Sequence, residues 1–248
     1  MEYSRVGFGF GLSSRTTAPW TAENEHRSDE EDMTVNTQQT TADPRAYGLP
    51  LVEGAAIPTE LRALVSRVHD LIDAVANTEV DTDTLADTAA TVQTLTDRLN
   101  VARRQIGTMV TREIGDGTTE VGTITNIVAG DTNPAAPRLA LMRTEEGLRA
   151  EITLNTIYQG PPGLVHGGWI AAMLDQAVGS VSAIETSPGL TAHLEVDYRR
   201  PTPLFTPLEI TSWVERVEGR KVYVAGQIKA HGQVTAEGSA LMIRVEAP

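Results

Sequence analysis

A histidine and two glycines stand directly before the most apolar stretch of the chain, at His166, Gly167 and Gly168. We expect the glycines to open a buried helix, where first-turn N–H groups lack helical partners and the helix dipole is positive. Because glycine has no side chain, a reacting carbonyl group can approach these N–H groups closely. The pattern predicts an oxyanion hole. Close packing of the helix against a sheet is the alternative explanation for the same glycines.

Asp175 is the only ionisable residue between Gly168 and Gly179. Burying a carboxylate in an apolar helix costs folding free energy unless it has a hydrogen-bond or ionic partner. A carboxylate at this position therefore indicates a structural or functional role. As a general base it would activate water, and as a nucleophile it would form a transient anhydride with an acyl group. A structural carboxylate that caps nearby backbone is the third interpretation. The sequence does not separate the base from the nucleophile.

Alternating strands must position these residues. The runs 190–199 and 208–217 alternate apolar and polar residues, and 220–230 and 233–245 follow after the short links Glu218-Gly219 and His231-Gly232. Such links predict an antiparallel meander. Residues 139–143 and 148–156 form a further expected strand pair. The stretch from Trp169 to Val178 is apolar nearly all round, which predicts a buried helix wrapped by the sheet.

The front of the chain divides differently. Residues 1–56 read as a disordered or loosely packed tail, in which Met33 is a possible alternative start. Residues 57–106 carry two apolar stripes at helical spacing and predict a helical hairpin that must dock on another surface. Residues 107–132 form a connecting segment with a possible strand, and 133–248 form the main domain.

Composition excludes several classes of function. The chain has 20 basic and 33 acidic residues, a net charge of −13, which argues against nucleic-acid binding. It contains no cysteine and no apolar run of about 20 residues, so we expect no membrane span and a cytoplasmic location. No His spacing suggests a metal site, and we expect no metal and no cofactor.

Two segments carry a resemblance to a known family. YQGPPGLVHGGWIAAMLDQAVG (158–179) and TAHLEVDYRRP (191–201) resemble the hotdog-fold acyl-CoA thioesterases, in the PaaI-like branch of the 4-hydroxybenzoyl-CoA thioesterase superfamily. The resemblance covers roughly residues 133–248. It implies an α+β hotdog fold, a long antiparallel sheet around one central buried helix, and metal-independent hydrolysis of an acyl-CoA.

The resemblance also implies roles for individual residues. The backbone N–H of Gly167 would stabilise the oxyanion, with His166 shaping the loop and Gly168 beside it. Asp175 would be the base or nucleophile, and the hydroxyl of Thr191 would hold the water or the carboxylate. For Thr191, an ordinary strand position is the alternative.

The sequence departs from the family pattern at one position. Some members place Asn or Gln six residues before the histidine, where this chain has Gly160, and Gln159 or Gln176 are the possible substitutes. Without that side chain, a non-catalytic acyl-CoA-binding or regulatory module remains the alternative function. A hotdog hydratase is disfavoured because it needs a His five residues after the Asp, where this chain has Ser180.

Further residues are expected to bind the substrate. Trp169 and Gln176 are expected among the substrate-binding residues, with Trp169 shaping the pocket. Arg199 and Arg200 would contact the phosphates of coenzyme A, since a guanidinium group forms bidentate hydrogen bonds with phosphate. A pair of arginines at a strand end is equally explained as a solvated edge.

Helix geometry predicts the assembly. Gly167 and Asp175 are eight residues apart, which places them roughly 12 Å apart along one helix. A reacting carbon needs both groups within about 3–4 Å. We therefore expect a homodimer, or a homotetramer built as a dimer of dimers, in which each active site is shared between subunits.

Overall fold

The computed structural model describes residues 43–245. Most of the predicted tail, including Met33, lies outside these residues. Residues 43–56, also assigned to the tail, instead form two short 3-10 helices, Pro44–Tyr47 and Gly54–Ala56, around strand β1 (Leu51–Glu53). The reason is that β1 pairs in parallel with a later strand, which satisfies its backbone groups.

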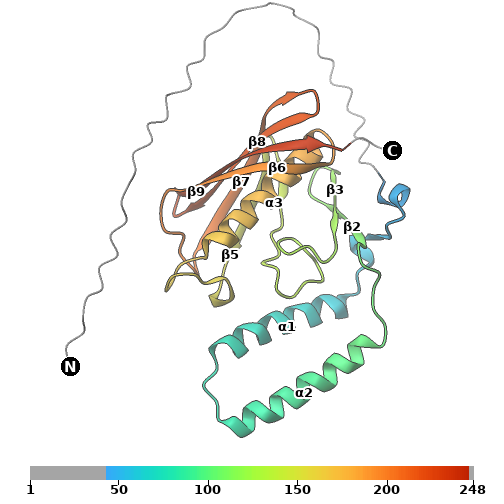
Figure 1. Cartoon of the computed structure of the whole chain (residues 1–248), viewed down its shortest axis with the longest axis vertical. Coiled ribbons are helices and arrows are strands. Elements are labelled where there is room, and N and C mark those ends of the chain that lie inside the picture. The colour runs from blue at the N-terminus through green and yellow to red at the C-terminus, as the bar shows by residue number, and fades with distance from the viewer. Residues whose placement is uncertain (1–42, 246–248) are drawn as a thin grey trace, which may run out of the picture. The chain divides into compact units, whose positions relative to one another are not determined.

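The predicted arrangement of a sheet around a central helix is confirmed (Figure 1). Helix α3 (Gly167–Glu185) packs against a six-stranded antiparallel sheet of order β4-β5-β7-β8-β9-β6. The strands are β4 (Met142–Thr144), β5 (Gly147–Thr153), β6 (Gly189–Tyr198), β7 (Pro207–Glu218), β8 (Lys221–Ala230) and β9 (Gln233–Arg244). Strand β6 is an edge strand of this sheet.

Burial explains why α3 lies where it does. Met173, Leu174, Ala177, Val178 and Val181 are completely buried, and they pack against inward-facing side chains of the sheet. Two sheet glycines allow the helix to come close. A Cβ atom at Gly226 would lie 3.3 Å from Val178 Cγ1, and one at Gly238 would lie 3.3 Å from Leu174 Cδ1.

A small second sheet occupies the segment that was predicted to be a connection with a possible strand. It has the order β1-β2-β3, with β2 (Met109–Glu113) and β3 (Thr119–Thr123) antiparallel. Arg112 on β2 forms ion pairs with Glu120 on β3 and with Asp131. Through Ser180, which donates a hydrogen bond to Glu120, this sheet is joined to the middle of α3.

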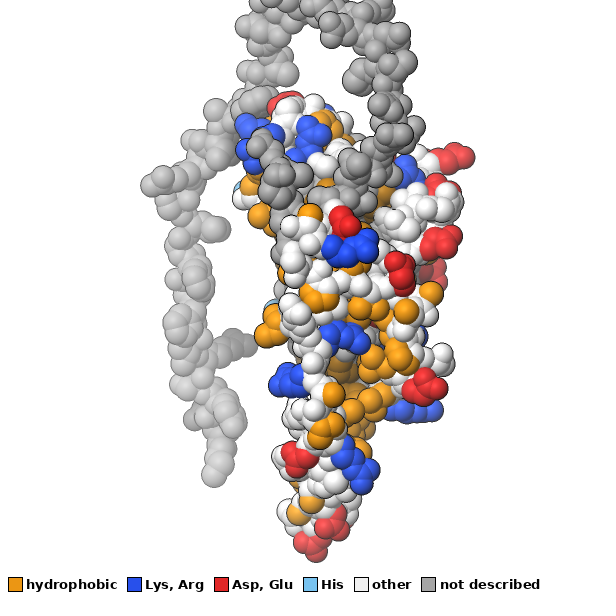
Figure 2. All heavy atoms as spheres, turned by 90° about the vertical axis from the view of Figure 1, so that its right-hand side faces the viewer, with side chains coloured by type: hydrophobic (Ala, Val, Ile, Leu, Met, Phe, Trp, Pro, Cys, Tyr) orange, Lys and Arg blue, Asp and Glu red, His pale blue; other side chains and the backbone are white. Residues whose placement is uncertain are grey.

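The two predicted helices are α1 (Thr59–Asn77) and α2 (Thr82–Asn100). Helix α1 is docked, since Thr156 donates to Asp73 at 2.5 Å and His69 contacts the carbonyl of Pro134. Helix α2 has no buried residue, and Leu85, Leu95 and Leu99 are about half exposed. Hydrophobic side chains accordingly reach the surface in the lower part of Figure 2, where the two helices lie.

Within residues 43–245, no helix is long and apolar enough to cross a membrane.

Candidate active site

The first turn of α3 is built by His166. This residue is the N-cap in extended conformation, and its Nδ1 accepts a hydrogen bond of 2.9 Å from the Gly168 N–H. The His166 N–H donates to the carbonyl of Tyr158, which ties the loop to the preceding turn. Among the described residues the Gly167 N–H has no acceptor. One first-turn N–H at the positive helix end is therefore open to a ligand oxygen.

Tyr198, at the end of β6, completes this turn. Its hydroxyl donates to the Gly167 carbonyl at 2.9 Å, and a Cβ atom at Gly167 would lie 3.4 Å from Tyr198 Cε1. Tyr198 belongs to the motif that carries the family resemblance, but no role was predicted for it. The sequence held no signal for this contact, because the partner is a backbone carbonyl on another element.

Gly160 is required by the same loop. A Cβ atom at this position would lie 2.8 Å from His166 Cα, a distance that real structures do not tolerate. The Asn or Gln that the family resemblance implies for this position in some members could therefore not fit here without moving His166. Gln159 does not replace it, because its Oε1 accepts the Gly163 N–H in a local turn.

Behind the loop, Trp169 stands edge-on to Tyr158, with ring centroids 5.0 Å apart. Trp169 is partly buried and packs against the core. Burial raises the pKa of Tyr158 to about 12, and its hydroxyl donates to the carbonyl of Ala135. These rings support the loop from the core side.

Asp175 and Thr191 meet, as the family resemblance implied. The Thr191 hydroxyl donates to Asp175 Oδ1 at 2.9 Å, across 16 residues of sequence. Asp175 is only half-buried, although the apolar sequence around it predicts a buried helix. The reason is that the sheet covers one side of α3 and leaves the side carrying Asp175 and Gln176 partly open.

A cavity of about 570 Å³ begins at this pair. It runs along α3 past Gln176, Gly179 and Ser180 to Ile184, and residues of β3 form part of its lining. Asp175 and Thr191 themselves line it, so a molecule bound there would contact the carboxylate.

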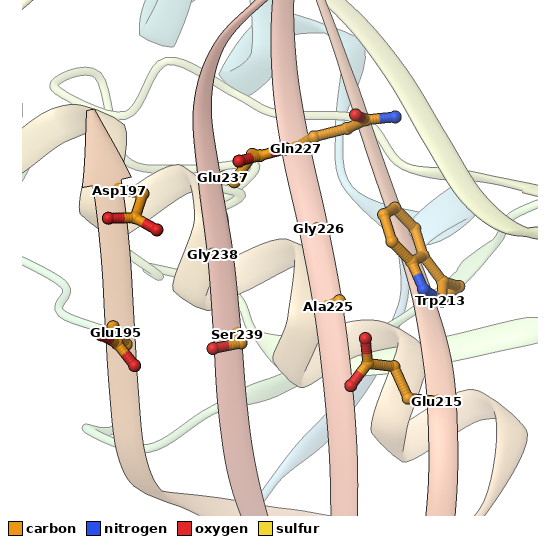
Figure 3. A pocket seen from close by; sticks show the side chains of 10 residues that line it. All are labelled: Glu195, Asp197, Trp213, Glu215, Ala225, Gly226, Gln227, Glu237, Gly238 and Ser239. Atoms are coloured by element: carbon orange, nitrogen blue, oxygen red, sulfur yellow. The ribbon is translucent and has the colours of Figure 1, made fainter. Parts of the chain in front are cut away.

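The two predicted phosphate contacts lie elsewhere. Arg199 forms ion pairs with Asp197 and with Glu237, and Arg200 donates to the carbonyl of Val234. Figure 3 shows Asp197 and Glu237 at a hollow on the face of the sheet opposite α3, together with Glu195 and Glu215. This acidic hollow is unsuited to phosphate, and Arg199 is occupied by its carboxylates.

No group of three or more His, Asp or Glu side chains suited to a metal ion occurs in the part of the chain that the structure describes.

Comparison with known proteins identifies relatives of this site. A sequence model described as "Thioesterase superfamily" matches residues 162–237. The chain is 42% identical to acyl-coenzyme A thioesterase THEM4 of Xenopus laevis over 89 residues, which are 35% of this chain and 40% of that protein. It is 37% identical to the Mus musculus protein of the same name over 90 residues, 36% of this chain and 39% of that protein. The chain thus matches about two fifths of the length of these curated relatives.

A solved structure extends the likeness beyond that segment. A crystal structure described as a thioesterase superfamily protein shares 32% identity with a TM-score of 0.65, covering 74% of this chain and 90% of the other.

Proposed function

The chain belongs to the thioesterase superfamily, and from this premise we propose that it hydrolyses an acyl-CoA thioester to a free acid and coenzyme A. The curated relatives are named acyl-coenzyme A thioesterases, which supports this substrate class.

The reaction uses groups that the geometry brings into reach. The thioester carbonyl oxygen accepts the open N–H of Gly167, which stabilises the negative charge that develops on it. Asp175 removes a proton from water as the water oxygen bonds to the carbonyl carbon. The carbon–sulfur bond then breaks, and the thiolate of coenzyme A leaves and takes up a proton.

A second route uses Asp175 as nucleophile. Its carboxylate attacks the carbonyl carbon and expels the thiolate, and water then hydrolyses the resulting anhydride. The hydrogen bond from Thr191 to Asp175 Oδ1 serves both routes, because it fixes the carboxylate and leaves Oδ2 to react. Treatment with borohydride during turnover distinguishes them, since only the anhydride route forms an activated Asp175 carboxyl group that borohydride reduces to the alcohol.

The observation that carries this proposal is the division of the two first-turn N–H groups. His166 accepts the Gly168 N–H and leaves the Gly167 N–H without an acceptor among residues 43–245. The N-cap histidine thus satisfies one of the two glycine N–H groups and leaves the other, at the positive end of α3, available to the thioester oxygen.

The test is turnover of a panel of acyl-CoAs, followed by release of free thiol. We expect release that is linear in enzyme concentration. Binding of acyl-CoA without thiol release would contradict the enzymatic proposal and favour a non-catalytic acyl-CoA-binding module.

We further propose that the active unit is a homodimer, alone or within a tetramer. The Gly167 N–H and Asp175 lie about two helical turns apart on α3, too far for one chain to bring both to one carbon. The edge strand β6 and the open side of α3 provide a face for a second copy, and Leu190 on β6 is 71% exposed. Two α3 helices running antiparallel would pair Gly167 of one subunit with Asp175 of the other.

For the phosphates of coenzyme A we retain Arg200 in preference to Arg199, because Arg200 makes one backbone hydrogen bond and no ion pair among the described residues. Arg200→Ala should raise KM for acyl-CoA and leave KM for an acyl-pantetheine thioester unchanged. Equal effects on the two substrates would contradict phosphate contact.

We also propose a cytoplasmic location, which the absence of cysteine from all 248 residues favours. Fractionation of cells that express the chain tests this.

A further inference from the structure

The cavity beside Asp175 is walled partly by a segment outside the residues that match the thioesterase family model. That match begins at residue 162, whereas Met109 on β2 and the whole of β3, Thr119–Thr123, line the cavity. The opposite wall is α3, where Gly179 stands one turn beyond Asp175. In the described part of the chain, a Cβ at Gly179 would come within 4 Å of just one atom outside the helix backbone, Met242 Cε at 3.9 Å. The small sheet and the open helix side thus enclose space rather than packed side chains.

The charges at this cavity have one sign. Among residues 43–245, the charged residues that line it are Glu120 and Asp175, and none of the described lining residues is Lys or Arg. Arg112 lies behind Glu120 and pairs with it and with Asp131, and Arg62 also pairs with Asp131, so both cations are already engaged by carboxylates. An acyl group with its own carboxylate would therefore approach Glu120 and Asp175 without an unpaired cation among the described residues that line the cavity.

A chain of hydrogen bonds fixes the one amide in the cavity. Gln176 Nε2 donates to Ser180 Oγ at 3.0 Å, and Ser180 donates to Glu120 Oε1 at 2.6 Å. A carboxylate can only accept hydrogen bonds, so the Ser180 hydroxyl donates its single proton to Glu120. The Ser180 oxygen can then only accept a hydrogen bond from Gln176. Gln176 must therefore turn its Nε2 toward Ser180 and its Oε1 away. Gln176 Oε1 accepts no hydrogen bond from the described residues. A carboxylate on the acyl group would therefore face this acceptor oxygen, with which it cannot form a hydrogen bond.

We propose that the cavity between β3 and α3 holds the acyl group of the substrate, an inference that rests on the proposed hydrolysis of acyl-CoA. Glu120 orients Gln176 through Ser180. In this orientation Gln176 favours neutral acyl groups over acyl groups that carry a carboxylate. Glu120 and Ser180 are positioning residues in this scheme, and Gln176 contacts the substrate.

The first experiment tests the cavity. The full chain is assayed for kcat/KM on straight-chain acyl-CoAs from acetyl to dodecanoyl. Gly179→Leu fills the cavity from α3, and we expect the ratio of dodecanoyl to acetyl turnover to fall at least about 10-fold. Ala183→Phe fills it one helical turn further along α3 and should shift the ratio in the same direction, so the test does not depend on one variant being folded. An unchanged ratio in a folded variant of either kind overturns the proposed pocket.

The matched control is Ser182→Ala. Ser182 lies on the same helix, is completely buried, does not line the cavity, and its Oγ has no hydrogen-bond partner in the described chain. We expect the chain-length profile of this variant to equal that of wild type. A shifted profile would mean that any change in α3 alters selectivity, and would overturn the assignment to the cavity.

The second experiment tests the selection against charge. Octanoyl-CoA is compared with the acyl-CoA of the same length that ends in a carboxylate. Glu120→Gln removes the charge and lets Ser180 and Gln176 reverse their hydrogen bonds, so the preference for the neutral substrate should fall at least about 10-fold. Ser180→Ala releases Gln176 but keeps the charge, and should lower the preference about 3-fold. A preference that does not change in either variant, while the proteins remain folded, overturns the role of Glu120.

The outcomes separate this inference from its premise. If wild type releases no thiol from any acyl-CoA, the proposed function is wrong. If wild type turns over acyl-CoA but the variants change neither ratio, only the assignment of the cavity and of Gln176 is wrong.

Discussion

Asp175 and Thr191 form the hydrogen-bonded pair on which the proposed reaction depends. The Thr191 hydroxyl satisfies Asp175 Oδ1 at 2.9 Å, while the open side of α3 leaves the carboxylate half-exposed to the cavity. A carboxylate that was completely buried would need partners for both oxygens and could not meet water. The partial burial of Asp175 therefore suits a base or nucleophile better than a structural cap.

The first prediction concerns Asp175→Asn. Asparagine keeps the volume and can still accept from Thr191, but it neither takes a proton nor attacks carbon. We expect kcat to fall at least about 100-fold while the melting temperature and acyl-CoA binding stay close to wild type. Turnover near that of wild type would exclude Asp175 from catalysis, and a large loss of stability without a specific rate defect would indicate a structural role.

A second prediction separates the hydroxyl of Thr191 from its shape. Thr191→Val removes the hydrogen bond to Asp175 at nearly constant volume, and we expect kcat to fall about 3- to 10-fold. Thr191→Ser keeps the hydroxyl and should retain most of the activity. If both variants lose activity equally, the methyl group rather than the hydrogen bond is what matters.

A third prediction concerns Gly160. Gly160→Ala would place a Cβ atom 2.8 Å from His166 Cα, so the loop before α3 must shift. We expect the free energy of unfolding to fall by about 1–3 kcal/mol, and kcat/KM to fall because the Gly167 N–H moves with the loop. Stability is measured by denaturant titration. Gly179→Ala is the matched change, since it meets only Met242 at 3.9 Å and should not lower stability.

At the scale of elements, the position of α3 is set by the glycines of the sheet beneath it. Gly238→Val adds a branched side chain where Leu174 already approaches within 3.3 Å of the Cβ position. Valine is a good strand former, so the cost comes from packing alone. We expect a loss of about 1–3 kcal/mol in the free energy of unfolding.

The control for this packing prediction is the next residue along β9. Ser239 is exposed on the other face of the sheet, and Ser239→Val should leave stability within about 0.5 kcal/mol of wild type. Equal losses at the two positions would mean that the strand, rather than its contact with α3, is what each substitution disturbs.

At the scale of the whole molecule, the proposed dimer makes a quantitative prediction. Asp175→Asn and Gly167→Pro are each expected to be inactive, the second because proline has no N–H to donate. When the two variants are unfolded, mixed equally and refolded, half of the random dimers are mixed and each has one intact site. Activity should return to about a quarter of wild type.

Native mass spectrometry serves as the control for the mixing experiment, because it counts the mixed dimers directly. A mixture that contains mixed dimers but stays as inactive as its parents would contradict the shared site.

Sequence patterns alone predicted the sheet and the central helix, which the structure confirms, and they singled out the candidate catalytic residues. Alternation in 190–199 and 208–217, the short links that follow, and the apolar run in 169–178 are local patterns. They predicted the strands and α3 because burial of one face dictates the period. The same reasoning failed for residues 43–56, whose strand β1 exists only through pairing with β2. It also overstated the burial of Asp175, because an apolar sequence does not reveal which side of a helix a sheet covers.

Only the tertiary structure decided what these residues meet. Thr191 reaches Asp175 across 16 residues, Tyr198 reaches Gly167 across 31, and Ser180 reaches Glu120 across 60. Periodicity reports which face of an element is apolar, but a contact between elements depends on how they pack in three dimensions. For that reason the catalytic candidates could be predicted from the sequence. The cavity beside them, and the chain of hydrogen bonds from Gln176 through Ser180 to Glu120, could not.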